Sequence, residues 1–517
     1  MGLSFGIIIT FAGLLLLAGV LSNKLSSRFN MPILLLFLLV GMAVGTHGLG
    51  ILHLEPEKHA GPINSLGTIA MCFILFSGGL GTSFNSIRPV LRSGVTLATL
   101  GVVLTALFLG ICGYLICLAF QHDTGLAWWM LMASLISSTD AAAMFAILRG
   151  NGVNLSGNLQ PLLELESGSN DPMAALMTLL MLQIVTAGSG FSFWQIPLLF
   201  YKISIGAVLG IFMGLAGKWL FGQRFEYEGL YYVLGVALVL ICFGVAELCH
   251  TNGFLAVYVC GVAMGNQKYN FRGGLAKFNE GVAWLMQVIL FTSLGVLVNP
   301  MDLLKLNVLI PGILLSMCMM FIARPGAVFL SLCKSRFSTR EKTLISWAGL
   351  RGAAPIVLAT FPLVAGVANS KLMFNMVFFM VIGSVLVQGV TLMPLARKLG
   401  LARSFRSKSR VPVELETLEG ANYDLHEFEV APGSPLIGLT LAEAKLPPGA
   451  LVTMIRRGKG FIPACGTTIV EEGDDLVVMG APDKLHELAD KYFPESGYAQ
   501  KHQVPDFLQK KLFVKNS

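Results

Sequence analysis

Long apolar segments follow one another through most of this chain of 517 residues, and they constrain its fold more than any other feature. About thirteen segments, bounded by Gly, Pro and charged residues, have the length that a helix needs to cross a bilayer. They lie at residues 4–21, 31–46, 63–81, 94–120, 125–148, 159–187, 196–221, 229–249, 251–266, 281–298, 307–333, 342–366 and 372–396. The chain is 55% hydrophobic and 13% charged, whereas soluble domains are about 25% charged. A soluble protein is excluded, and residues 1–396 are predicted to form an all-α polytopic domain in the lipid bilayer.

Basic residues in the predicted loops gather on one side of the membrane. When successive loops are assigned to alternate sides, fourteen Lys and Arg residues fall on one side and four on the other. Because basic loops stay in the cytoplasm, the N-terminus is expected outside and the region after residue 396 inside. We expect this membrane to be a bacterial plasma or inner membrane. Since the basic excess lies in short loops rather than on a soluble face, no nucleic-acid partner is expected.

Motifs for enzyme chemistry are missing from the sequence. There is no nucleophile elbow, no phosphate-binding loop and no Cys/His pattern with metal-ligand spacing. The nine cysteines are expected to be small buried apolar residues, without a disulfide framework. We therefore expect neither an enzyme nor a bound cofactor.

Seven ionisable side chains fall inside the predicted membrane segments, where burying a charge is costly and therefore indicates function. They are Asp140, Glu164, Glu166, Asp171, Glu247, Arg324 and Arg351. For Glu164 and Glu247, pairing between helices or a place near the membrane surface is an equally good interpretation.

The densest polar cluster is the segment 163–172, which reads LELESGSNDP. At about 100° per residue, Ser167 and Asp171 share one helix face and can offer oxygen atoms to one small cation. Glu166 lies about 140° away from Asp171 around the helix, so it is expected to meet a basic residue on another helix. Pro172 lacks an N–H, which predicts an interruption of the helix beside the carboxylates.

Two further segments carry signs of interrupted helices. Residues 137–143 read SSTDAAA, in which four side chains compete for backbone hydrogen bonds and Asp140 is suited to cap the following half-helix. Residues 349–355 read GLRGAAP. Small residues in any one such segment would also suit close helix packing alone. Interrupted helices with buried charges, however, mark the substrate site of transporters near the membrane midplane.

These motifs resemble those of the monovalent cation:proton antiporter family, in its NhaP-like branch related to sodium/proton exchangers. The resemblance covers nearly the whole membrane part and rests on Ser138-Thr139-Asp140 and on residues 166–172, ESGSNDP. It implies a fold with crossed broken helices and inverted repeats, and a scaffold that supplies a homodimer contact.

The resemblance also implies a role for each matching residue of the ion site. Asp171 would exchange protons for cations beside Asn170, while Thr139 and Asp140 would form the break in span five. Ser167 matches a cation ligand of the family. A monovalent cation is therefore expected at Asp171, Ser167 and Thr139.

Three further residues match a structural ion pair of the family, and one position departs from its pattern. Glu166 matches an acid that pairs with an arginine, and Arg324 and Arg351 match two family arginines. Members usually carry an acid in span three within a Phe-acid-x-Gly pattern, whereas residues 76–79 here read FSGG. Ser77 thus replaces an auxiliary carboxylate of the ion pathway.

The activity that the resemblance implies is exchange of K+ or Na+ for H+, in a role suited to pH homeostasis. Asn170 in place of a second Asp matches the electroneutral branch, and Asp171 would hold either a proton or a cation during alternating access. A cation-responsive membrane sensor is an alternative that Ser77 keeps open. A channel-like protein without coupled exchange is another, although no selectivity-filter segment is evident.

The last quarter of the chain has a different pattern. Residues 397–423 are predicted to form a basic linker, residues 424–493 a small α/β domain and residues 494–517 a C-terminal tail. Strands are predicted at 426–430, 438–443, 450–455 and 473–480, turns at 446–449 and 472–474, and a closing helix up to Tyr492; Ile462-Pro463 belongs to the same pattern.

This α/β pattern resembles the RCK C-terminal (TrkA-C) domain, which implies a cytoplasmic regulatory dimer that binds a small ligand. A folded dimerisation module without a ligand is an equally good interpretation. No GxGxxG motif is present, so control by NAD is not expected. Because this domain accompanies potassium channels and transporters, the resemblance favours K+ over Na+ by analogy.

Overall fold

The structure is a computed structural model that describes most of the chain. The described residues are 33–46, 50, 56–119, 124–150, 153–155, 157–188, 192–267, 269, 271–404, 424–431, 433–458 and 460–493, with six positions before residue 18. They belong to two compact units, residues 1–406 and 407–517. Most of the predicted segment 4–21, most of the predicted linker and the tail after residue 493 lie outside the described residues.

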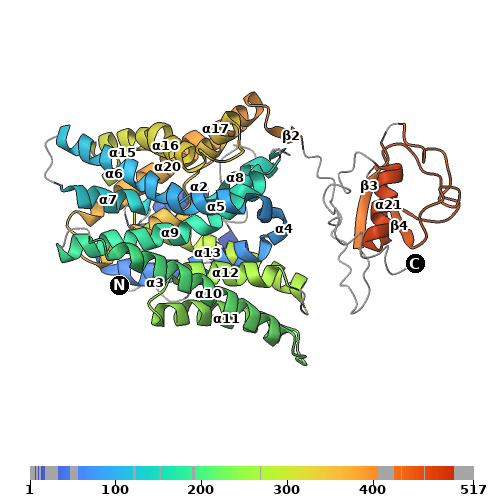
Figure 1. Ribbon diagram of the computed structural model, residues 1–517, viewed down its shortest axis with the longest axis horizontal. Coiled ribbons are helices and arrows are strands. Elements are labelled where there is room, and N and C mark those ends of the chain that lie inside the picture. Colours follow the sequence, from blue (N-terminus) through green and yellow to red (C-terminus); the bar gives the residue numbers. More distant parts are fainter. Residues whose placement is uncertain are drawn as a thin grey trace. The chain divides into compact units, whose positions relative to one another are not determined.

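The first unit is a bundle of helices (Figure 1). Its long uninterrupted helices are α2 Ile33–Val44, α3 Pro56–Gly81, α9 Leu159–Ala187, α10 Gln195–Phe221, α11 Gly229–Leu248, α12 Gly253–Gly265, α13 Arg272–Val296 and α20 Ser370–Lys398. All the predicted segments after the first coincide with helices, which confirms the mostly helical fold. Six of the described helical stretches are long and apolar enough to cross a bilayer. The number of spans and the inverted repeat stay predictions.

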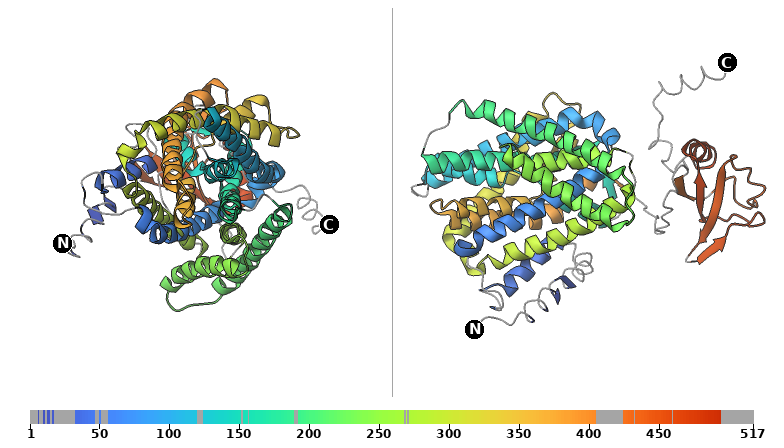
Figure 2. Two further views of the ribbon diagram at one scale, coloured as in Figure 1. Left: turned by 90° about the vertical axis from the view of Figure 1, so that its left-hand side faces the viewer. Right: turned by 90° about the horizontal axis from the view of Figure 1, so that it is seen from below.

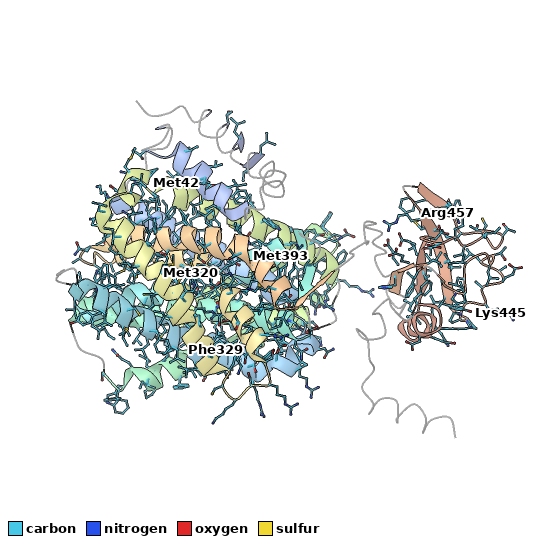
Figure 3. All side chains as sticks on the ribbon, turned by 90° about the horizontal axis from the view of Figure 1, so that it is seen from above. Met42, Met320, Phe329, Met393, Lys445 and Arg457 are labelled. Carbon is cyan, nitrogen blue, oxygen red and sulfur yellow. The ribbon has the colours of Figure 1, made fainter. Side chains whose placement is uncertain are left out.

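Several further helices follow one another in sequence without a gap. They are α4 Phe84–Ile87, η1 Arg88–Val90, α5 Leu91–Thr96, η2 Leu97–Gly101 and α6 Val102–Ala119, and then α15 Leu306–Cys318, η3 Met319–Ala323 and α16 Arg324–Ser331. η2 and η3 are π-helical turns. Two short helices, α14 Pro300–Leu303 and α19 Thr360–Val364, complete the unit. Apolar side chains fill its interior, among them Met320 on η3 and Met393 on α20 (Figure 3).

Two helices of the bundle are interrupted, as the sequence predicted for these segments. α7 Leu126–Leu135 is separated from α8 Ala141–Gly150, and α17 Thr339–Trp347 is separated from α18 Ala353–Leu358. The two non-helical segments meet, because the Asp140 N–H donates a hydrogen bond to the Leu350 carbonyl at 2.7 Å. A Cβ atom on Gly352 would overlap the Asp140 side chain, so this close approach requires glycine.

The interruption predicted at Pro172 was wrong. α9 runs without a break from Leu159 to Ala187 and contains Pro172 in its interior. Neighbouring helices can hold the backbone of a membrane helix in place around a proline. Here the Asn252 side chain of the α11–α12 connection donates a hydrogen bond to the Pro172 carbonyl at 2.9 Å. One turn earlier, Gly168 lies directly against the ring of Tyr258 on α12.

α10 and α11 lie side by side at the edge of the bundle (Figure 2). The glycines of α10 face α12, where a Cβ on Gly210 or Gly214 would meet its backbone or side chains. The opposite face of α10 exposes large apolar side chains such as Phe200 and Phe212, which are 65% and 67% exposed. An apolar face of this size is stable only against lipid or another protein chain.

A small two-stranded sheet, which the sequence did not predict, also belongs to the first unit. β1 Val153–Leu155 follows α8, and β2 Ala402–Ser404 follows α20. The two strands pair antiparallel, with Asn154 opposite Arg403. The chain that leaves the last long helix is therefore bound to the connection between α8 and α9.

The second unit is a four-stranded antiparallel sheet with one helix. Its elements are β3 Asp424–Glu429, β4 Ala450–Arg457, β5 Gly460–Pro463, β6 Asp475–Gly480 and α21 Pro482–Tyr492, with strand order β3-β6-β4-β5. Phe428, Ile455 and Val478 of the sheet pack with Leu485 and Leu488 of α21. At the end of β4, Arg457 bonds the buried carboxylate of Asp474 at 2.8 Å (Figure 3). The predicted small α/β domain is confirmed.

One detail of the predicted domain was wrong. Residues 438–443 form turns rather than a strand, with only an isolated bridge between Thr440 and Ile469. The reason is local, because Thr440 and Glu443 close a reciprocal turn through the Glu443 carboxylate and the Glu443 N–H. Ile462 and Pro463 form the end of β5, an edge strand in which a proline is tolerated.

Candidate ion-binding site

The helix break at residues 136–140 is attached directly to α9. The Ser167 hydroxyl donates a hydrogen bond to the Thr139 carbonyl at 3.1 Å. The Asn170 amide, fully buried one residue before Asp171, donates to the Thr139 hydroxyl at 2.5 Å. The predicted residues Thr139, Ser167, Asn170 and Asp171 therefore lie together, although 28 residues separate Thr139 from Ser167.

Asp140 and Asp171 are close in space but differ in their partners. An Asp140 carboxylate oxygen accepts a hydrogen bond from the Ala143 N–H at 3.1 Å, so it caps α8 as its sequence position suggested. Asp171 lies within electrostatic range of Asp140 and Arg351 and is partly exposed. The Ser138 hydroxyl faces the Asp171 carboxylate without reaching hydrogen-bond geometry, and within the described part of the chain Asp171 forms no ion pair. Its carboxylate is thus available to a proton or a cation.

Two buried oxygen atoms beside Asp171 have no hydrogen-bond partner. They are the Ser138 hydroxyl and the side-chain carbonyl of Asn170. Buried polar atoms are nearly always satisfied, so such atoms indicate a bound ion or water. The candidate ligands therefore include Ser138, which was not singled out from the sequence. Its signal was present in the run of polar side chains at 137–140.

Glu166 pairs with Arg324, one of the two arginines proposed from the sequence. Their side chains meet at 2.5 Å, and both are almost fully buried. Arg324 begins α16 directly after the π-helical turn η3, and its guanidinium lies against Gly349 of the second helix break. A Cβ at Gly349 would stand 2.7 Å from Arg324 Nε, so glycine is required there. This ion pair joins α9 to α16 beside the site.

Arg351 does not join this ion pair, which corrects the expectation for it. Its fully buried guanidinium donates hydrogen bonds to the carbonyls of Ser137, at 2.9 Å, and Ser138. These carbonyls follow the end of α7, where the last backbone oxygens lack helical donors and a positive charge is favoured. The Arg351 N–H donates to the Ser384 hydroxyl on α20 at 3.2 Å. Arg351 therefore holds the two helix breaks together.

Ser77, the position that departs from the family pattern, lies on α3 and is partly exposed. The next turn packs tightly on α12, where Gly79 lies against the backbone of Tyr258. Tyr258 is buried, and its hydroxyl has no hydrogen-bond partner.

Two interrupted helices that meet beside a partly buried carboxylate, within a bundle of apolar helices, are the arrangement of secondary transporters. Residues 12–398 match the sequence model of the family described as "Sodium/hydrogen exchanger, transmembrane". The chain belongs to this family. Residues 425–492 match the model described as "TrkA-C domain".

Relatives with assigned names agree with this membership. The chain is 34% identical over 505 residues to "K(+)/H(+) antiporter NhaP2" of Shewanella sp. (strain ANA-3), covering 96% of this chain and 84% of that protein. It is 37% identical over 392 residues to "K(+)/H(+) antiporter NhaP" of Alkalimonas amylolytica, covering 75% and 66%. It is 27% identical over 412 residues to "Na(+)/H(+) antiporter NhaH" of Halobacillus dabanensis, covering 75% and 97%. These names place the chain among transporters.

A solved structure shares the fold. The sodium proton antiporter MjNhaP1 from Methanocaldococcus jannaschii superposes with a TM-score of 0.63 at 23% identity, covering 75% of this chain and 100% of that chain. The crossed helix breaks are thus set in the fold of a known antiporter.

Proposed function

We propose that this protein exchanges a monovalent cation, K+ in preference to Na+, for H+ in an electroneutral, alternating-access cycle. One observation carries the proposal: Asp140 caps a helix and Glu166 pairs with an arginine, while Asp171 caps no helix and forms no ion pair with a described residue. A carboxylate that takes either a proton or a cation, but not both, couples the two fluxes. The names of the relatives support the choice of K+.

The proposed cation site combines Asp171 with the neighbouring oxygens of Ser167, Thr139, Ser138 and Asn170. Oxygen ligands of this kind suit a hard cation. The Glu166–Arg324 pair and Arg351 are positioning groups that hold α9 and the two breaks in place. The cation itself is the transported substrate, and no resident cofactor is required.

The remaining assignments are part of the same proposal. The exchanger domain comprises residues 1–396, followed by a linker at 397–423, a regulatory domain at 424–493 and a tail at 494–517. The N-terminus lies outside a bacterial plasma or inner membrane, and the regulatory domain lies in the cytoplasm. The exposed apolar face of α10 supports a homodimer. The regulatory domain either binds a small ligand or serves as a dimerisation module.

Proteoliposomes with an imposed pH gradient test the exchange directly. Addition of K+ is expected to dissipate the gradient at lower concentrations than addition of Na+, and clamping the membrane potential at zero is expected to leave the rate unchanged. A rate that follows the membrane potential would contradict electroneutral exchange. Dissipation of a cation gradient without proton movement would favour a channel, and no response to any cation would favour a sensor.

Replacing Ser138 by Ala is expected to weaken cation binding without abolishing exchange. We expect the loss of one oxygen ligand to cost about as much binding free energy as the loss of one hydrogen bond. The cation concentration for half-maximal exchange should therefore rise by about fivefold. Initial rates over a range of K+ concentrations measure this. Thr186 lies on an exposed turn of the same helix, α9, so Thr186→Ala is the matched control. Its half-maximal cation concentration should equal that of the wild type. An unchanged half-maximal concentration in Ser138→Ala would exclude Ser138 as a ligand.

A further inference from the structure

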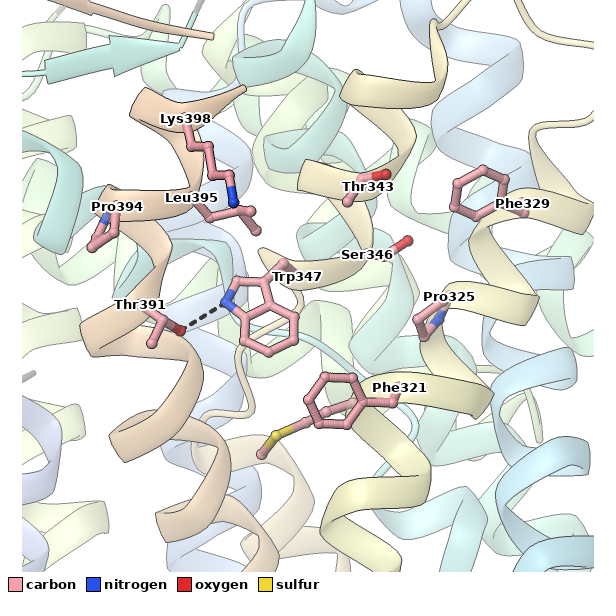
Figure 4. A pocket seen from close by; sticks show the side chains of 11 residues that line it. Phe321, Pro325, Phe329, Thr343, Ser346, Trp347, Thr391, Pro394, Leu395 and Lys398 are labelled. Atoms are coloured by element: carbon pink, nitrogen blue, oxygen red, sulfur yellow. Dashed lines mark hydrogen bonds between the residues drawn. The ribbon is translucent and has the colours of Figure 1, made fainter. Parts of the chain in front are cut away.

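An apolar groove of about 470 Å³ opens on the first unit between η3, α16, α17 and α20 (Figure 4). Its floor is the indole of Trp347, whose N–H donates a hydrogen bond to the Thr391 hydroxyl at 2.9 Å. The ring of Phe321 lies 5.6 Å from that of Trp347, at an angle of 56°. Phe329 forms part of the opposite wall. Aromatic side chains therefore form much of the groove, and a hydrogen bond holds the indole of Trp347 in place.

The hydroxyl groups on the groove wall are already used within the protein. The Thr343 hydroxyl donates to the Thr339 carbonyl at 2.9 Å, and the Ser346 hydroxyl donates to the Lys342 carbonyl at 2.8 Å. The helix surface beside the groove is apolar and exposed, with Phe321 58% and Leu330 53% accessible. Such a surface is suited to contact with the hydrocarbon core of a membrane.

One end of the groove is strongly basic. α16 and α20 end there and α17 begins there, since Phe329, Thr343 and Lys398 line the same groove. Figure 4 shows Lys398 extending from α20 into the groove above Trp347. Lys398 lines the groove, and the adjoining chain segments 332–342 and 397–398 carry five further basic residues, all at least partly exposed: Lys334, Arg336, Arg340, Lys342 and Arg397. The acid in the same segments, Glu341, caps α17 through Ser338.

We propose that this groove binds an anionic phospholipid, with an acyl chain along Trp347 and Phe321 and the phosphate at Lys398. An apolar trough that ends at the Lys398 ammonium, which forms no ion pair among the described residues, matches the two parts of such a lipid. A soluble anion would gain nothing from the apolar walls, and a neutral lipid would gain nothing from the six basic residues.

The groove adjoins the two chain segments that carry the buried arginines beside the ion site. Pro325 on its wall directly follows Arg324, the partner of Glu166. Trp347 on its floor lies two residues before Gly349, which contacts the Arg324 guanidinium. The lipid would therefore pack against the outer surface of the same two segments that carry the buried arginines on their inner surface.

Fluorescence quenching by brominated acyl chains tests the binding site on the full chain in vesicles. Trp347 is one of six tryptophans. Its emission is therefore obtained by subtracting the fluorescence of Trp347→Phe from that of the wild type. Brominated phosphatidylglycerol is expected to quench this emission at a roughly fivefold lower mole fraction than brominated phosphatidylcholine. This factor corresponds to the attraction of one lysine to one anionic lipid. Lys398→Gln should remove that difference.

The control is Lys218→Gln, which removes a basic residue from the last turn of another long helix, α10. It should leave the preference for the anionic lipid intact. Equal quenching by both lipids, or a preference that survives Lys398→Gln, would overturn the proposal. Absence of quenching by either lipid would also overturn it, because another protein segment would then cover the groove.

Native mass spectrometry is an independent measurement of bound phosphatidylglycerol. It compares the lipid retained by Lys398→Gln, in which Trp347 is intact, with that retained by the wild type. The test does not depend on transport.

Discussion

Replacing Asp171 by Asn is expected to abolish cation-dependent proton exchange, leaving the rate of protein-free vesicles. Asn has nearly the same shape as Asp but can neither release a proton nor neutralise a cation. Asp140 cannot substitute for Asp171, because its carboxylate caps α8 through the Ala143 N–H. The measurement is the initial rate of pH-gradient dissipation in proteoliposomes after addition of K+ or Na+.

The matched control for this variant is Glu247→Gln. Glu247 is another acid within an apolar helix, α11, but its side chain is exposed and its helix contains neither Asp171 nor a helix break. Its exchange rate should equal that of wild type. If Asp171→Asn still exchanged cations for protons while eluting as a folded protein, competitive occupancy of Asp171 would be wrong. If Glu247→Gln were equally inactive, loss of activity would not identify the ion site.

The second large effect is expected for the buried ion pair between α9 and α16. Glu166→Gln leaves the Arg324 charge buried without its partner, which should lower the free energy of unfolding by about 3–5 kcal/mol. The thermal unfolding midpoint in detergent reports the relative stability. Exchange should also be impaired, because the pair holds α9 one turn from Asn170 and Asp171.

Two further variants distinguish the ion pair from a general effect of substitution. The double variant Glu166→Leu/Arg324→Met should be more stable than either single variant, since it leaves no buried charge unpaired. Glu164→Gln is the matched control on the same helix. Glu164 is partly exposed and accepts a hydrogen bond from Gln160, so its substitution should change stability by less than about 0.5 kcal/mol. Additive single effects in the double variant would contradict direct coupling.

The segment 163–172 shows how far periodicity could predict the site. The angle between Glu166 and Asp171 around a helix correctly indicated different neighbours, because α9 is a regular helix over this whole segment. The same regularity made the interruption predicted at Pro172 wrong. A missing N–H predicts a break only if no neighbouring helix supports the backbone, and the Asn252 and Tyr258 contacts come from residues about 80 positions away.

Arg351 shows a limit of a different kind. Its position in a Gly-Leu-Arg-Gly motif identified it as functionally relevant, but the motif did not predict whether it would meet a carboxylate or backbone carbonyls. The carbonyls of Ser137 and Ser138 are available to it only because the two helix breaks meet in space. In the C-terminal unit, likewise, a local turn between Thr440 and Glu443 prevailed over the strand pattern of residues 438–443.

The sequence by itself determined the membrane class, the helical segments, the exchanger motifs and the small α/β domain. These follow from apolar length, from local backbone chemistry and from short motifs, all of which act within about 30 residues. The tertiary structure alone decided which partners the charges have: Glu166 with Arg324, Arg351 with carbonyls, and Asp171 with none among the described residues. Ion pairs and helix caps depend on distances between segments far apart in the chain, and only packing of the bundle sets those distances.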